Sequence, residues 1–154
     1  MINYKICDKE RIKDVINFVK FIDNEFPIKL SNLVNIEDYI KKLITYGNVL
    51  VAKDKNKIVG ICAGYMNDIE KYNAYISILG IDSEYRKLGI ATGLVNVFIE
   101  KANKCGMKRI FLETHKENFS ALNFYKKNEF IVLEDVKPNT EGSVILMREL
   151  DNRG

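Results

Sequence analysis

Apolar residues recur every three to four positions in two N-terminal segments, and this spacing places them on one face of a helix. The first segment predicts a helix from about Lys9 to Ile22, which Asp8 is placed to cap. A polar stretch over 23–35 breaks the period. The second segment predicts a helix over Ile36–Thr45, which Gly47 ends. The periodic apolar residues are Ile12, Val15, Ile16, Val19, Tyr39, Ile40, Leu43 and Ile44.

Shorter apolar segments bounded by polar turns predict strands. We expect strands over Tyr4–Cys7, Val49–Lys53, Ile58–Met66, Tyr72–Ile81, Arg109–Thr114, Phe130–Leu133 and Val144–Arg148. The four polar residues at 54–57 predict a hairpin between the second and third of these strands. The second to fourth expected strands follow one another as a meander and lead into the C-terminal half, where helices and strands alternate.

Two further helices are expected in that half. One runs from Ile90 to about Cys105 before Gly106, with apolar residues on almost every face, so it should be largely buried. The other, Asn118–Lys127, is short and rich in aromatic residues. The resulting order is strand, two helices, three strands, helix, strand, helix and two strands. An antiparallel meander followed by a strand–helix–strand unit predicts a single α/β domain over 1–154, with helices on a mixed sheet.

The strand over Tyr72–Ile81 changes its own rhythm. Its apolar residues fall on even numbers up to Ile78 and then on odd numbers at Leu79 and Ile81, with Gly80 at the change. A change of parity beside a glycine is what a β-bulge produces, and a bulge leaves backbone groups open to a ligand. The alternative is a strand buried on both faces and therefore apolar throughout.

A turn then leads from this strand into the helix that begins at Ile90. The first backbone N–H groups of a helix lack intrahelical partners and lie at the positive end of its dipole, so they form an anion site. Gly89 permits close approach of a ligand, Ala91 keeps the wall low, and Arg86 and Lys87 add positive charge. These features suit a diphosphate. The sequence lacks the GxxxxGK[ST] pattern of P-loop NTPases and the GxGxxG pattern of dinucleotide-binding folds.

Composition narrows the remaining classes of function. The net charge of +3 is spread along the chain without a basic stripe, which argues against a nucleic-acid partner. Three separated cysteines and one histidine favour neither a disulfide framework nor a zinc site, so no metal is expected. The chain shows no apolar signal segment after Met1 and no apolar run of membrane-spanning length. We therefore expect a reduced, cytoplasmic protein without a membrane partner.

The segment from Ile78 to Ala91 resembles the central motif of the GNAT acetyltransferases, R/Q-x-x-G-x-G/A after a strand, which Arg86, Gly89 and Ala91 match. A second family motif, N-x-x-A-x-x-F/L-Y followed by a glycine and Phe, is also matched apart from its glycine. Its matching residues are Asn118, Ala121, Phe124, Tyr125 and Phe130. Glu129 stands where the family has the glycine, and Asn128 is the residue we expect to take the left-handed turn instead.

The resemblance implies a GNAT-like fold: a central, mostly antiparallel sheet with a bulged and splayed strand and helices on both faces. It also implies acetyl-CoA as the acyl donor. The pyrophosphate residues would be Arg86, Lys87, Leu88, Gly89, Ile90, Ala91 and Thr92. Leu79, Gly80 and Ile81 would pair with the pantetheine arm, Asn118 would complete the cofactor site, and Tyr125 would act as general acid toward the departing thiolate.

The acceptor side is less defined by the sequence. The resemblance places the acceptor near Asn24–Leu33, including Phe26 and Pro27, and near the loop over 135–142. Tyr65, Tyr72 and Tyr75 are candidates for lining that cleft, and Asp23 and Glu25 are candidates for attracting a cationic amine. The general base stays open among Glu113, Glu117, Asp23, Glu25 and a water-mediated route, while His115 is more readily explained as a surface residue.

The leading hypothesis is an N-acetyltransferase acting on the primary amine of a small molecule. Amino sugars, polyamines, aminoglycosides, amino acids and protein N-termini all stay open as acceptors. The alternatives are a protein or peptide N-acetyltransferase and a noncatalytic acyl-CoA-binding module. A homodimer is a common assembly in the family, although no interface is visible in the sequence.

Overall fold

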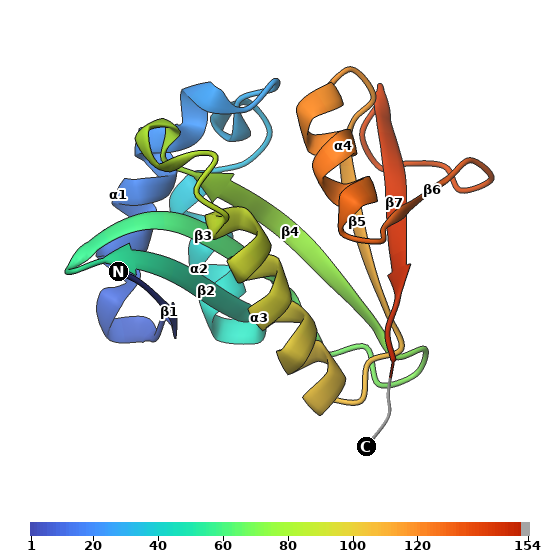
Figure 1. Cartoon of the computed structure of the whole chain (residues 1–154), viewed down its shortest axis with the longest axis horizontal. Helices are drawn as coiled ribbons and strands as arrows, with labels where there is room; N and C mark the ends of the chain where they lie inside the picture. Colours follow the sequence, from blue (N-terminus) through green and yellow to red (C-terminus); the bar gives the residue numbers. More distant parts are fainter. Residues whose placement is uncertain (152–154) are drawn as a thin grey trace.

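The computed structural model describes residues 1–151. In that range seven strands form one sheet in the order β1-β2-β3-β4-β5-β7-β6 (Figure 1). The strands are β1 (Ile2–Ile6), β2 (Asn48–Asp54), β3 (Lys57–Tyr65), β4 (Asn73–Ile81), β5 (Arg109–His115), β6 (Ile131–Leu133) and β7 (Ser143–Glu149). The helices are α1 (Ile12–Ile22), α2 (Ile36–Tyr46), α3 (Ile90–Lys104) and α4 (Phe119–Lys127). The expected order of elements is confirmed.

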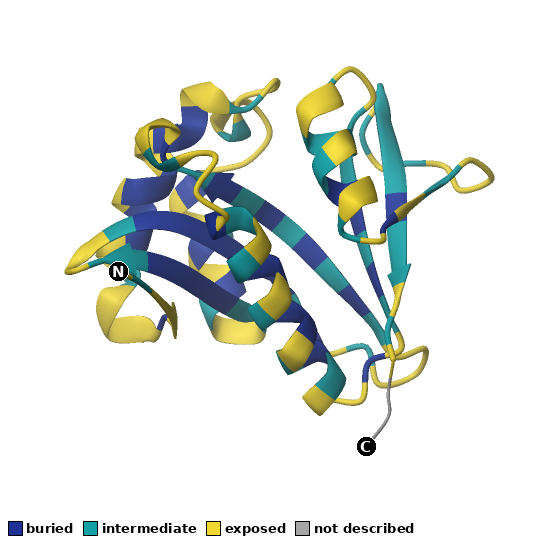
Figure 2. Cartoon of the chain, viewed as in Figure 1, coloured by how far each residue is buried: buried dark blue, intermediate teal, exposed yellow. Residues whose placement is uncertain are grey.

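Helices cover both faces of the sheet, as expected. One apolar core lies under α1 and α2 and includes Val19, Ile40 and Ile61. The other lies under α3 and α4 and includes Phe98 and Tyr125. Figure 2 shows that β2 and β3, between the two helical layers, are the most continuously buried strands. No helix within residues 1–151 is long and apolar enough to cross a membrane.

The N-terminal helices differ in detail from the expectation. Asp8 caps a short 3-10 turn, Lys9–Arg11, by accepting from the Glu10 N–H, and α1 begins only at Ile12. Gly47 does end α2, but in an extended conformation (φ −123°) rather than a left-handed one. A Cβ at Gly47 would collide with the carbonyl oxygen of Gly64. The glycine is therefore required by the close approach of β3.

The side chains of β4 do change faces at a β-bulge, but the bulge lies three residues earlier than the sequence suggested. Ala63 pairs with Ile78 and Gly64 with Ile76, so Ser77 is the extra residue of a bulge. On one side of it Ile76 faces the α3 core, and on the other side Ile78 faces the α1–α2 core. Gly80 is not at the bulge. A Cβ at Gly80 would collide with Ile22 and approach Phe26, so packing against α1 requires the glycine there.

The two central parallel strands separate soon after they meet. β4 pairs with β5 only at Asn73–Arg109, Ala74–Ile110 and Tyr75–Phe111, although both strands continue beyond these pairs. β5 then pairs along its whole length with β7. The sheet is therefore split into two halves that form a V (Figure 1), and the expected splayed strand is confirmed.

The helix α3 is buried on one side rather than on nearly all. Thr92, Asn96 and Glu100 form an exposed line at four-residue spacing. Cys105 is exposed and caps the end of α3, whereas Cys62 is buried. All three cysteines are free thiols.

The turn after α4 departs from the expectation at a single residue. Asn128 keeps a negative φ of −96°, and Glu129 takes the left-handed conformation with φ 69°. The Phe130 N–H donates to the Tyr125 carbonyl (3.0 Å) and the Glu129 N–H to the Lys126 carbonyl (3.1 Å). This pair of bonds is the Schellman motif, which normally has glycine at the position of Glu129. Glu129 therefore takes the left-handed conformation that the glycine of the family motif would take, and this conformation costs free energy in a residue with a Cβ.

We predict that Glu129→Gly stabilises the protein. Removing the Cβ relieves about 1 kcal/mol of left-handed strain, while the ion pair of the exposed Glu129 carboxylate with Arg148 (3.1 Å) contributes less. For a chain of this size the midpoint of thermal unfolding should rise by about 2–4 °C. The control, Glu129→Ala, keeps the strain and should not stabilise. A lower midpoint for the glycine variant than for the alanine variant would contradict the prediction.

Candidate active site

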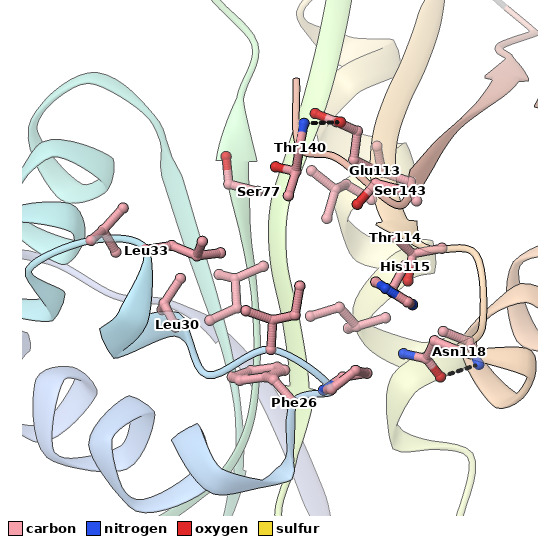
Figure 3. Close-up of a pocket in the computed structure, with 18 of the residues that line it drawn as sticks. Phe26, Leu30, Leu33, Ser77, Glu113, Thr114, His115, Asn118, Thr140 and Ser143 are labelled. Atoms are coloured by element: carbon pink, nitrogen blue, oxygen red, sulfur yellow. Dashed lines mark hydrogen bonds between the residues drawn. The ribbon is translucent and has the colours of Figure 1, made fainter. Parts of the chain in front are cut away.

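A cavity of about 510 Å³ opens where β4 and β5 separate. Figure 3 shows its walls: Phe26, Leu30 and Leu33 lie on one side of β4, and Glu113, His115 and Asn118 lie on the other. The segment between α1 and α2 supplies the first wall, and β5, α4 and the chain before β7 supply the second. The splay of the sheet therefore creates the site.

Three of the residues expected to contact the cofactor or its leaving group meet at this cavity. Leu79, Asn118 and Tyr125 all line it. The Asn118 Oδ1 accepts from the Ala121 N–H (3.2 Å) and so begins α4, which leaves its amide nitrogen free to donate. Gly80 and Ile81 do not line the cavity, because Gly80 packs against α1 and Ile81 joins the α3 core.

Tyr125 is the buried phenol of the site. Its side chain is 7% exposed, and its ring makes edge-to-face contacts with Phe124 (centroids 5.3 Å apart) and Phe130 (5.5 Å). Burial, with a smaller contribution from Cys62, raises the pKa of Tyr125 above its ordinary value. The hydroxyl therefore stays protonated at neutral pH and is able to donate a proton or a hydrogen bond into the cavity.

The loop before α3 has the backbone geometry of an anion site. Lys87 (φ 66°) and Gly89 (φ 79°) both take left-handed conformations, and Gly89 caps the helix without a side-chain bond. Within the described residues, none of the backbone N–H groups from Lys87 to Thr92 has an acceptor. A Cβ on Gly89 would meet nothing within 4 Å, so the space in front of these groups is open.

Two contacts hold the turn before this loop in place. The Tyr85 hydroxyl donates to the Asp54 carboxylate (2.8 Å), and this bond raises the pKa of Tyr85. The Lys57 ammonium lies 3.7 Å from the buried carboxylate of Asp82 and over the Tyr85 ring. Residues of the β2–β3 hairpin thus fix the start of the loop.

The acceptor-side acids suggested by the sequence are already engaged. The Asp23 carboxylate is buried and accepts from the Ser31 N–H (3.1 Å). Glu25 forms an ion pair with Arg86, the first residue of the segment over 86–92, which we call the anion loop. Neither residue lines the cavity, because each is needed to hold the segment between α1 and α2. Tyr75 does line the cavity, whereas Tyr65 and Tyr72 do not.

Glu113 lines the cavity but its carboxylate is saturated. One oxygen accepts from the N–H groups of Asn139 (2.7 Å) and Thr140 (3.2 Å). The other accepts from the Asn139 side-chain amide (3.0 Å) and the Tyr75 hydroxyl (3.3 Å). A carboxylate offers about four acceptor positions. Glu113 therefore ties the loop before β7 to the sheet.

His115 is engaged through one ring nitrogen. Its Nδ1 accepts from the Glu117 N–H (3.2 Å), which assigns the proton of the neutral ring to Nε2. In that tautomer the ring has no free lone pair to accept a proton from a substrate. The remaining acid considered from sequence, Glu117, does not line the cavity.

Some residues of the cavity carry no local sequence signal. Tyr39 lies in the apolar stripe of α2, yet its hydroxyl reaches the carbonyl oxygen of the bulge residue Ser77 (3.0 Å). Thr140 and Ser143 come from the loop before β7, which Glu113 positions. Only the strand pairing brings these residues together. Among residues 1–151, no group of three or more His, Cys, Asp or Glu residues is arranged to hold a metal ion.

We predict that Glu113→Gln loosens the loop before β7. Glutamine keeps the shape but replaces one acceptor oxygen with an N–H donor that opposes its partners, at a cost of about 1–3 kcal/mol. Denaturant unfolding and hydrogen exchange at the Asn139 and Thr140 amides measure this effect. The exposed neighbour Glu117→Gln is the matched control and should change neither. Equal free energies of unfolding and equal amide protection in the two variants would contradict the role of Glu113 in holding the loop before β7.

Comparison with known proteins identifies the family of this chain. The acetyltransferase (GNAT) family model matches residues 19–130. N-alpha-acetyltransferase 30 of Schizosaccharomyces pombe is 34% identical over 82 residues, covering 52% of this chain and 55% of that protein. Streptothricin acetyltransferase A of Bacillus subtilis is 34% identical over 73 residues, covering 46% of this chain and 42% of that protein. The chain thus spans about half the length of these curated relatives.

Solved structures show the same fold over nearly the whole chain. A GNAT acetyltransferase from Staphylococcus aureus Mu50 superposes with a TM-score of 0.81 at 23% identity, covering 98% of this chain and all of that one. The PaiA N-acetyltransferase of Thermoplasma acidophilum, solved in complex with coenzyme A, superposes with a TM-score of 0.75 at 20% identity, covering 97% and 99%. Because the family model matches most of its length, this chain belongs to the acetyltransferase (GNAT) family.

Proposed function

We propose that this chain transfers the acetyl group of acetyl-CoA to the primary amine of a small molecule. The observation that carries the proposal is the position of Tyr125, a buried phenol that lines the cavity between the separated strands. The three free thiols suit a reducing compartment, which supports the cytoplasm as its location.

The donor would lie between the anion loop and the cavity. The pyrophosphate would accept from the unpaired N–H groups over 87–92, with the helix dipole and the positive charge of Lys87 adding attraction. The pantetheine arm would follow β4 past Leu79, Gly80 and Ile81, whose outer edge is free because β5 has diverged. Asn118 would donate from its free amide nitrogen.

The reaction needs a neutral amine and a stabilised leaving group. The amine nitrogen forms a bond to the thioester carbon, and backbone N–H groups near Leu79 and Gly80 would stabilise the resulting oxyanion. The C–S bond then breaks, Tyr125 donates its proton to the sulfur, and the proton lost by the nitrogen returns through solvent to the phenolate. The products are an amide and the free thiol of coenzyme A.

The proton transfer from Tyr125 is close to balanced in energy. Ordinary values of about 10 for a phenol and about 8.5 for a thiol make it uphill by about 2 kcal/mol. Burial raises the pKa of Tyr125 further, but it also raises the pKa of a thiol that leaves into the same cavity. The hydrogen bond from Tyr125 to the departing sulfur is therefore the larger part of its proposed role.

A peptide N-terminus is the second candidate acceptor. Ile28, Leu33 and Val34 line the cavity and are exposed at its rim, where residues following the first of a peptide would pack. An N-alpha-acetyltransferase is also among the relatives. A peptide panel run beside the small amines distinguishes the two candidates.

Acetyl-CoA should raise the midpoint of thermal unfolding. A ligand at about 100 times its dissociation constant stabilises the folded state by about 2.7 kcal/mol. Free coenzyme A should stabilise the protein as well, because the pyrophosphate contacts are shared. An unchanged midpoint at millimolar acetyl-CoA would remove the basis for the proposal.

Tyr125→Phe should lower kcat by about 100-fold or more, the usual scale for losing a general acid. The KM for acetyl-CoA should change little, since the ring and its edge-to-face contacts remain. Thiol release from acetyl-CoA measures both. The matched control is Tyr46→Phe, which removes an exposed hydroxyl outside the cavity. Wild-type turnover and an unchanged pH profile in Tyr125→Phe would exclude the role, whereas cofactor binding without turnover by the wild type would favour a noncatalytic module.

A further inference from the structure

The geometry points to a specific class of acceptor: an amine with a single positive charge in solution and an apolar group next to its nitrogen, which reacts in its neutral form. This inference rests on the proposed N-acetyltransferase function. It excludes the polycationic acceptors that the sequence left open, namely polyamines and aminoglycosides.

The carboxylates at and near the acceptor side of the cavity already have protein partners. Among the described residues that line the cavity, Glu113 is the only carboxylate. Its two oxygens already accept four hydrogen bonds, from Asn139, Thr140 and Tyr75. The nearby acids Asp23 and Glu25 are bound to the Ser31 N–H and to Arg86. No carboxylate of the described lining is free to pair with an ammonium group.

Three other titratable groups that line the cavity, Tyr39, Tyr75 and His115, are also bound to protein partners. The Tyr39 hydroxyl donates to the Ser77 carbonyl and the Tyr75 hydroxyl to Glu113. Burial raises the pKa of Tyr39 to about 12, so it is not a base at neutral pH. His115 holds its proton on Nε2, because Nδ1 accepts from Glu117. No group facing the acceptor is therefore poised to take a proton from it.

The surface left for the acceptor is apolar. Phe26, Pro27, Ile28, Leu30, Leu33 and Val34 form one continuous wall from the segment between α1 and α2. Figure 3 shows Phe26, Leu30 and Leu33 together on the side of the cavity opposite His115 and Asn118. An apolar group attached to the amine gains about 25 cal/mol for each Å² of apolar surface that this wall covers.

These two properties select against polycations. Moving an ammonium group from water into an apolar site without a counterion is strongly unfavourable, and the group loses its proton instead. A monoamine loses only one proton, from the nitrogen that must be neutral to attack the thioester. A polyamine also carries additional ammonium groups, for which the described cavity lining offers no counterion. The shared chemistry of the expected acceptors is therefore a lone amine beside an apolar group, whether on a small molecule or at a peptide N-terminus.

The test compares three acceptors by kcat/KM for thiol release: 2-phenylethylamine, a tripeptide with N-terminal phenylalanine, and spermidine. We expect at least one of the two apolar amines to exceed spermidine by about tenfold or more, the change that about 1.4 kcal/mol produces. The ratio between the apolar arms separates a small-molecule source from a peptide source. Below the pKa of the amine, kcat/KM should rise by about tenfold per pH unit, because only the neutral fraction reacts.

A variant with an added carboxylate tests whether the lack of a counterion in the cavity causes the preference for monoamines. Leu33→Glu adds an unpartnered carboxylate to the wall, at a residue that is 55% exposed and so tolerates the change. It should shift the preference toward spermidine by about tenfold. The matched control, Ile69→Glu, adds the same charge at a residue that is 78% exposed and does not line the cavity. It should leave the preference unchanged.

The outcomes separate this inference from the function on which it rests. If spermidine is the best acceptor of the wild type, the inference is overturned while the acetyltransferase function stands. If kcat/KM is independent of pH below the pKa of the amine, a protein base exists and the inference is overturned as well. If no amine releases thiol although acetyl-CoA stabilises the protein, the proposed function fails and the inference falls with it.

Discussion

The separation of β4 from β5 is the constraint on which the rest of the molecule depends. Three residue pairs join the strands, after which β5 follows β7 and β4 follows β3. Beyond these pairs each strand keeps one paired edge, interrupted in β4 by the bulge at Ser77, so the sheet stays intact while the facing edges are released. The bulge at Ser77 follows the last of these pairs and turns Ile78 toward the opposite core. A cavity therefore lies in the middle of the sheet without a disrupted core.

An ion pair connects the anion loop to the segment that carries the apolar wall of the cavity. Arg86 belongs to the anion loop, and its ion-pair partner Glu25 directly precedes Phe26 in the apolar wall. The β2–β3 hairpin holds the other end of the same turn through Asp54 and Lys57. Residues distant in sequence thus hold the anion loop: Glu25 on one side, and Asp54 and Lys57 on the other. These contacts keep the unpaired N–H groups of the loop preorganised.

Most polar groups around the cavity have a structural role. Glu113, Asp23 and Tyr39 each satisfy backbone groups that the loops and the bulge would otherwise leave unpaired. This use removes them from acid–base chemistry. The phenol of Tyr125 is different, because apolar packing and two aromatic contacts hold its ring, and its hydroxyl is left for the reaction in the proposed mechanism.

The sequence by itself determined the order of elements and the position of the anion loop. Helical and strand periods, caps and turn glycines are local properties, so Asp8, Gly89 and Asn118 could be interpreted without knowledge of distant neighbours. The two motifs also placed Tyr125 at the site. Only the tertiary structure decided that the bulge lies at Ser77, because a register shift belongs to a pair of strands. It also decided that Gly47 and Gly80 are required by close packing against neighbouring segments, and that the acids of the acceptor side are occupied. Their partners lie far away in the sequence, and long-range hydrogen bonds leave no periodic trace in the chain that makes them.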